Sequence, residues 1–187
     1  MSDRYIAGGK LYFSQLNADG ATYAAEREIG EVQDVSLQTN TDFAEAMNKD
    51  GALPVKSDKV AKSFSATLSF STIRLNKENL AMALNATLTT EIFAIAATLP
   101  NGATAAAETT LDVIQGGENT LLKGKFRFVA EIAAGTNQPV LEIPIAVVSS
   151  NDAVAFMSDD FASLKFDGEV LKHDTDGYFK EYLIPVV

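Results

Sequence analysis

Few side chains in this sequence can carry nucleophilic or acid–base chemistry. The 187 residues include one histidine, His173, and no cysteine. The lack of cysteine excludes a thiol nucleophile, a disulfide framework and a cysteine-built zinc site. No Gly-x-Ser-x-Gly elbow accompanies His173, so a Ser-His-Asp triad lacks support. Because Asp174 follows directly, we expect His173 to be a solvated residue beside a turn.

Carboxylates are plentiful, with 25 Asp and Glu, but no pair is selected for catalysis. Asp159 with Asp160 and Glu26 with Glu28 are the closest pairs along the chain. Glycosidase chemistry requires two carboxyl groups about 5 to 10 Å apart across a cleft, whereas adjacent residues of a strand point to opposite faces. The absence of Trp also weakens a sugar-binding site. We therefore expect no enzymatic activity, and an acid–base hydrolase is a minor alternative.

Motifs for metals, phosphates and cofactors are incomplete. Residues 174–177 (Asp-Thr-Asp-Gly) resemble part of a calcium loop, but Lys172 stands where an oxygen ligand is needed. Because the apolar Tyr178 follows, a hairpin turn is the better interpretation. No phosphate loop or dinucleotide fingerprint occurs, and the pairs at 8–9 and 116–117 are interpreted as turn glycines. The sequence predicts no metal and no cofactor.

The charge balance is strongly acidic. The formal net charge is −10 and the sequence pI is about 4.5, which argues against binding nucleic acid through a basic surface. The first ten residues contain only Tyr5–Ala7 as an apolar run, and the longest apolar segment, Ile92–Leu99, is far shorter than the ~20 residues of a membrane span. We expect a chain made in the cytoplasm, with no membrane partner.

Apolar residues repeat with a period of two, which is typical of half-buried antiparallel strands. Between Ser63 and Ser71, apolar residues alternate with Ser and Thr without a break. The predicted inward residues are Phe64, Ala66, Leu68, Phe70; Phe126, Phe128, Ala130, Ile132; Leu141, Ile143, Ile145, Val147; and Ala162, Leu164, Phe166, Val170. Further strands are predicted at 10–16, 31–39, 88–98, 110–115 and 178–187. This pattern predicts a mainly β chain, an antiparallel β-sandwich or barrel formed by one domain over residues 1–187.

Two positions interrupt the alternation. The apolar phase slips between Val32 and Val35, which predicts a β-bulge. Pro144 lies inside an otherwise regular strand, so we expect a sheet edge or a bulge there.

One short flanking α-helix is predicted after Asn76, which is a suitable N-cap. Leu75 and Leu80 have the spacing of a hydrophobic staple, and Asn85 can end the helix. The predicted buried stripe consists of Leu80, Ala81 and Leu84. With about eight residues, this helix must pack on the sheet to be stable.

The segment 40–62 lacks sustained alternation and is predicted to be a long inter-strand loop. It contains four acidic and four basic residues together with large apolar ones. Long loops in compact domains are usually functional or disordered, and scattered apolar groups favour docking on a partner. A flap over the protein's own core is the alternative. The candidate contact residues are Phe43, Met47, Leu53, Pro54 and Val55.

The order of these elements resembles that of the tail tube (major tail) proteins of tailed bacteriophages, most closely the long-tailed type. The segments that carry the resemblance are 9–13 (GKLYF), 29–37 (IGEVQDVSL), 63–70 (SFSATLSF), 79–84 (NLAMAL) and 166–171 (FDGEVL). The likeness extends over most of the chain as an order of elements.

The resemblance implies a structural virion protein that forms hexameric rings. Such rings stack into a tube through which DNA passes into the host, and other tail proteins bind the tube ends. It also implies that the loop at about 40–62 reaches an adjacent ring, and that assembly occurs in the host cytoplasm. Double-stranded DNA carries about one negative charge per 1.7 Å, so an acidic lumen would repel DNA and let it slide. The sequence does not indicate which acids face that lumen.

Other functions fit the same composition. A tail-tip, terminator or contractile-tail tube subunit is the nearest alternative. A monomeric β-sandwich binding module or a pilin-like surface protein belongs to a different class. The acidic excess is uneven: residues 1–62 carry 7 basic and 10 acidic groups, and residues 63–187 carry 8 and 15. This distribution favours a repelling barrel with an electrically balanced docking loop.

Overall fold

Strands dominate the part of the chain that the structure, a computed structural model, describes. This part comprises residues 8–48, 55–117, 122–131, 137–150, 152–154 and 163–185. The elements are β1 (Gly9–Gln15), β2 (Arg27–Glu28), β3 (Val32–Asn48), β4 (Val55–Thr72), α1 (Lys77–Ala83), β5 (Thr87–Phe93), β6 (Thr109–Gln115), β7 (Leu122–Ala130), β8 (Gln138–Ser149), β9 (Leu164–Val170) and β10 (Lys180–Ile184). The predicted mainly β chain with one short helix is confirmed.

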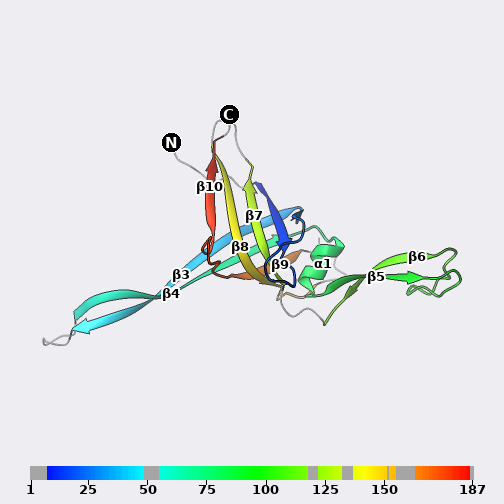
Figure 1. The fold of residues 1–187 in the computed structure, drawn as a ribbon, viewed down its shortest axis with the longest axis horizontal. Helices are drawn as coiled ribbons and strands as arrows, with labels where there is room; N and C mark the ends of the chain where they lie inside the picture. The colour runs from blue at the N-terminus through cyan, green and yellow to red at the C-terminus, as the bar shows by residue number, and fades with distance from the viewer. Residues whose placement is uncertain are drawn as a thin grey trace.

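Eight of the strands form one antiparallel sheet in the order β2-β1-β7-β8-β9-β4-β3, with β10 paired to β8. Two strands pair along the same edge of β8. Residues 138–142 of β8 pair with β10, and residues 146–149 pair with β9. The strands β5 and β6 form a separate two-stranded ribbon. Figure 1 shows that the ends of β3 and β4 leave the core on one side, while β5 and β6 leave it on the other.

Four phenylalanines connect the two halves of the sheet across the core. The ring of Phe126 on β7 lies 4.8 Å from that of Phe13 on β1 and 5.7 Å from that of Phe70 on β4. Phe70 stacks in turn on Phe166 of β9 at 4.9 Å. All four side chains are at most 3% exposed. The β1–β7–β8 half and the β9–β4 half therefore enclose a single aromatic core.

The alternation in β4 and β9 is confirmed within this core. Ala66, Leu68 and Phe70 are buried, and β9 buries every second residue from Leu164 to Val170. Phe64 differs, because its side chain is 38% exposed at the point where β4 leaves the core. Ile132 and Ala162, which were predicted to face inward, lie outside the described residues.

The predicted inward phase of β8 is confirmed up to Pro144 and wrong beyond it. Ile143 is buried and Leu141 packs against the core, whereas beyond Pro144 the strand buries Ala146 and Val148 in place of Ile145 and Val147. The reason is the bulge expected at Pro144. Ile143 pairs with Phe126 and Ala146 pairs with Gly124, so two residues of β8 oppose a single residue of β7. One extra residue reverses the inward face of a strand.

The bulge predicted between Val32 and Val35 is also confirmed. Gln33 pairs with Ser71 and Ser36 pairs with Ser69, so three steps along β3 match two along β4. Asp34 has a φ of 55°, in the left-handed region. Beyond this bulge, the side chains of β3 point alternately to the two faces of the sheet, and Leu37 packs against the core.

Helix α1 begins as predicted but presents a different face. The side chain of Asn76 accepts a hydrogen bond from the Asn79 backbone N–H at 2.7 Å, so the N-cap is confirmed. The buried residues are Asn79, Ala81, Met82 and Ala83. Leu84, predicted to be buried, is 41% exposed, and Leu75 is 50% exposed.

The polar residue Asn79 determines which face of the helix is buried. Its side chain is fully buried, and both its amide nitrogen and its amide oxygen are hydrogen-bonded. Its amide nitrogen donates to the carbonyl oxygens of Ile29 at 2.8 Å and Arg74 at 2.9 Å. Its side-chain oxygen accepts from Arg27 Nη1 at 2.7 Å. Burial lowers the pKa of Arg27, and the nearby Glu78 carboxylate opposes this shift. This one amide therefore links the helix to Ile29 and Arg27, in addition to the apolar packing of Met82 and Ala83 in the core.

Replacing Asn79 by Ala would leave two buried carbonyl groups and the Arg27 guanidinium without their partner. Because a buried unsatisfied polar group costs about 1–3 kcal/mol, we expect the N79A variant to lose at least about 2 kcal/mol of unfolding free energy in urea titrations. The control is Asn76→Ala, which removes only the cap and costs about 1 kcal/mol. A loss for N79A no larger than that for N76A would show that the amide contacts contribute little.

Candidate assembly surfaces

The predicted loop at 40–62 is a β-hairpin over most of its length, so the loop prediction is wrong there. Residues 40–48 complete β3 and residues 55–62 begin β4, in register from Asn40 opposite Ser65 to Asn48 opposite Val55. The register shifts at two places, where Lys62 and Ser57 are the extra residues of β4. These two bulges explain why the alternation is not visible in the sequence of β4. We call residues 40–48 with 55–63 the β3–β4 arm.

Two of the predicted contact residues lie on one side of the β3–β4 arm. Phe43 and Met47 are 47% and 49% exposed. Strand residues an even number of positions apart share a face, so both continue the side of β3 on which Leu37 packs against the core. The arm thus extends an apolar face beyond the core that would cover it.

Charged groups of the β3–β4 arm flank these apolar side chains. The Lys59 ammonium lies 3.9 Å from the centre of the Phe43 ring, within the range of a cation–π contact. Lys56 pairs with Glu45 across the hairpin at 2.5 Å. Val60 is 58% exposed, and it was not among the predicted contacts. Leu53 and Pro54 lie outside the described residues, and Val55 begins β4 without a described side chain.

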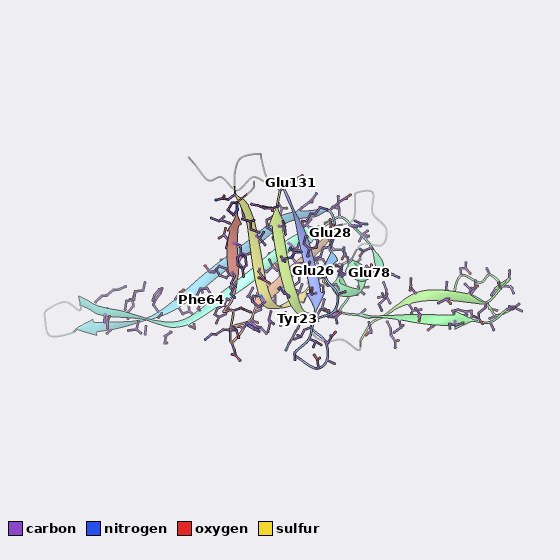
Figure 2. The ribbon with its side chains drawn as sticks, turned by 45° about the horizontal axis from the view of Figure 1, so that its top comes forward. Tyr23, Glu26, Glu28, Phe64, Glu78 and Glu131 are labelled. Atoms are coloured by element: carbon purple, nitrogen blue, oxygen red, sulfur yellow. The ribbon has the colours of Figure 1, made fainter. Side chains whose placement is uncertain are left out.

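The base of the β3–β4 arm is held by Tyr178. Its ring lies 4.7 Å from that of Phe64, and its hydroxyl donates to the Phe64 carbonyl oxygen at 3.1 Å. Figure 2 labels Phe64 at the junction of arm and core. The two residues are 114 positions apart, and neither strand alternation nor a turn motif indicated this contact.

The turn before Tyr178 confirms the predicted hairpin at 174–177. His173 and Gly177 exchange backbone hydrogen bonds of 2.8 and 3.0 Å. His173 Nδ1 lies 3.2 Å from an Asp176 carboxylate oxygen and accepts from the Asp176 backbone N–H. The pairing of Asp176 with Lys180 lowers the pKa of that carboxyl group. His173 therefore takes part in a turn that positions the Tyr178 contact.

Glu26 and Glu28 do not form a carboxylate pair. Glu26 accepts from Arg127 Nε at 2.9 Å, and this bond lowers the pKa of Glu26. Glu28 lies 3.4 Å from the Lys10 ammonium. Each acid is therefore paired with its own cation and not with the other carboxylate. Asp159 and Asp160 lie outside the described residues.

The outward face of β9, β4 and β3 forms a polar wall. Its rows run across the three strands: Asp167, Ser69 and Ser36 form one row, and Glu169, Thr67 and Gln38 form the next. The Ser69 hydroxyl donates to Asp167 at 2.8 Å. The sequence predicted the uncharged outward face of β4. It did not predict that β9 lies beside β4 and supplies the carboxylates.

The sheet ends at an open edge. Among the described residues β3 pairs in the sheet only with β4, so no described strand is joined to its other edge. Such an edge is a ready template for pairing with another chain.

One cleft of about 310 Å³ lies between β1, helix α1 and the start of β5. Its lining mixes apolar side chains, including Phe13 and Met82, with Arg27 and Glu78. Arg27 is already bonded to Asn79 there, so the guanidinium has a structural role.

Within the described ranges, no group of three or more His, Asp or Glu side chains is placed to hold a metal ion. In the same part of the chain, no helix is long and apolar enough to cross a membrane. No protein-family model matches the sequence, and no curated protein matches it significantly.

Replacing Tyr178 by Ala should loosen the β3–β4 arm without unfolding the core. The variant loses an aromatic pair and a hydrogen bond, together worth about 1.4 kcal/mol or more. We expect amide hydrogen exchange to accelerate about ten-fold in 41–47 and 58–64 but not in 66–72. Tyr182→Ala on β10, where the side chain is 43% exposed, is the control. Equal acceleration in both variants would contradict the role of Tyr178.

Proposed function

We propose that this protein is a structural subunit of a bacteriophage tail tube, which self-assembles into stacked hexameric rings. The observation that carries the proposal is the β3–β4 arm, which presents Phe43 and Met47 beyond the core. The order of elements along the chain, which resembles that of tail tube proteins, supports it independently. The subunit needs no cofactor and catalyses no reaction.

The exposure of the β3–β4 arm is the first reason to expect a neighbouring copy. A two-stranded ribbon is at best marginally stable in water unless another element covers it. Here Phe43, Met47 and Val60 are each about half exposed. Packing of the arm on the adjacent ring would bury these side chains, and the arm's balanced charge would not oppose that contact.

The open edge of β3 is the second reason. Joining it to a sheet edge of a neighbouring subunit would satisfy its backbone groups and continue the sheet around a ring. A head-to-tail contact of this kind closes into a ring when the rotation that relates neighbouring subunits is an integral fraction of a full turn. Six copies would then form one continuous barrel.

The polar wall is the third reason. Small hydroxyl side chains with Asp167 and Glu169 form a surface that offers DNA phosphates little attraction, although Lys165 borders it at Ser71. In a tube this wall would line the lumen, where acidic groups repel the duplex and let it slide. DNA would thus be a cargo that does not bind. Other tail proteins would occupy the tube ends, in a virion assembled in the host cytoplasm.

Electron microscopy of the purified protein tests the proposal, and rings or tubes with a central channel are expected. In the matched variant, Phe43–Lys62 are deleted and Asp42 is joined to Ser63 through Asn-Gly. Because Asp42 and Ser63 are paired, a two-residue type I′ turn can close this shorter hairpin.

We expect the shortened variant to fold but to form no stacked tubes, and F43S/M47S to weaken stacking. Leu75→Ser, which changes an exposed leucine on the core, is the control. A wild-type protein that stays monomeric at high concentration in several salt conditions would overturn the proposal. Unchanged tubes from the shortened variant would overturn the role of the arm.

The position of the polar wall can be tested with DNA. Tubes of D167K/E169K should retain short duplexes that resist nuclease, because the lumen wall becomes attractive, and this retention should fall with rising salt. The control E131K/E181K makes the same charge change at two other exposed positions. Wild-type tubes should retain no protected DNA. Protection in both variants, or in neither, would show that the wall does not line the lumen.

A further inference from the structure

The ribbon of β5 and β6 is a second arm, defined here as the β5–β6 arm, residues 87–115. Its strands pair only with each other among the described residues, from Thr87 opposite Gln115 to Phe93 opposite Thr109. Figure 1 shows it pointing away from the core, on the side opposite the β3–β4 arm. At its base, Lys77 of helix α1 pairs with Asp112 at 2.7 Å. The helix therefore braces the arm.

The tip of the β5–β6 arm is folded on itself. Thr98 and Thr104 form an antiparallel bridge, and Ala105 is only 3% exposed. The Ala105 carbonyl oxygen accepts from the Ala96 N–H at 2.8 Å, and its N–H donates to Ala97 at 2.9 Å. A self-bonded tip of this kind is preorganised for contact, because little order remains to be gained on binding.

Apolar side chains occupy both faces of the β5–β6 arm. Cross-strand partners share a face, so one face carries Leu88, Ile92 and Ile114, while the other carries Phe93, Leu111 and Val113. Ile92 is 68% exposed, and Ile95 at the tip is 69% exposed. These are larger exposed fractions than those of Phe43 and Met47. Phe93, Leu111 and Val113 are partly buried, so it is the face with Leu88 and Ile92 that lacks cover and is suited to an external partner.

The negative charge of the β5–β6 arm favours a partner surface that carries basic residues. No Lys or Arg occurs between residues 78 and 122, whereas the arm carries Glu91 and Glu108 in addition to the paired Asp112. Two β5–β6 arms from different copies would therefore repel each other. The β3–β4 arm provides the complement, because Lys59 lies over the Phe43 ring and Lys62 is the bulge residue next to Ala61, the strand partner of Phe43.

We propose that the β5–β6 arm of one copy packs against the β3–β4 arm of a neighbouring copy. Ile92 and Ile95 would contact the apolar side chains around Phe43, and the negative charge of Glu91 and Glu108 would favour the approach of Lys59 and Lys62. The two arms leave opposite sides of the core. Each copy would therefore contact one neighbour through its β3–β4 arm and a second neighbour through its β5–β6 arm. Such a heterologous contact propagates an assembly. This inference rests on the self-assembly proposed above and names its contact.

Charge exchange between the arms tests the contact. The variants are E91K/E108K, K59E/K62E and the combination of all four changes, and the readouts are sedimentation velocity and electron microscopy of the full chain. Each double variant should weaken self-association at least ten-fold, because the two arms then carry charge of the same sign. The combination should restore it to within about three-fold of wild type. Circular dichroism verifies that every variant is folded.

The apolar part of the contact has its own variant, I92S/I95S, which should reduce self-association without changing the unfolding transition. Leu75→Ser is again the matched control. The arm-to-arm contact is overturned if the variant with all four changes assembles no better than the double variants. It is also overturned if the double variants assemble like wild type. In both cases the tube proposal stands. A wild-type chain that never self-associates would overturn both.

Discussion

The structure depends on the chain of four phenylalanine rings that joins β1 and β7 to β4 and β9. Because β8 and β9 share only a short paired segment, the packed rings of Phe13, Phe126, Phe70 and Phe166 are a main link between the two halves across the core. Their approach requires Gly124, since a Cβ there would lie 2.3 Å from the Phe13 ring. With the halves locked together, the outward face of β9, β4 and β3 becomes a rigid wall.

The same core leaves both arms without cover. Burial in β4 ends at Ala66, and beyond it the hairpin continues for many residues in solvent. The β5–β6 arm contacts helix α1 at its base, through Lys77 and Asp112, and extends away from the core beyond it. Several large apolar residues on these ribbons stay exposed in the single chain, among them Phe43, Met47 and Ile92. Their exposure is the basis of the self-assembly proposed above.

Much of this fold could be predicted from local patterns. The period of two located the strands, Asn76 marked the start of the helix, and both expected bulges are present. The contact residues Phe43 and Met47 were predicted from their apolar character in a charged segment. The hairpin around them was not, because two bulges in β4 hide its alternation. The contact of Tyr178 with Phe64 and the wall acids on β9 depend on pairings between distant segments.

The sequence alone determined the strand class, the acidic charge and the absence of cysteine chemistry, because these follow from residue types and short-range spacing. The tertiary structure decided which residues meet. It placed Asn79 rather than Leu84 in the interface of helix α1, since only the amide reaches two carbonyls and Arg27. It reversed the inward face of β8 beyond Pro144 and directed the arms to opposite sides of the core. These outcomes depend on strand register, which is settled by contacts between segments and not within them.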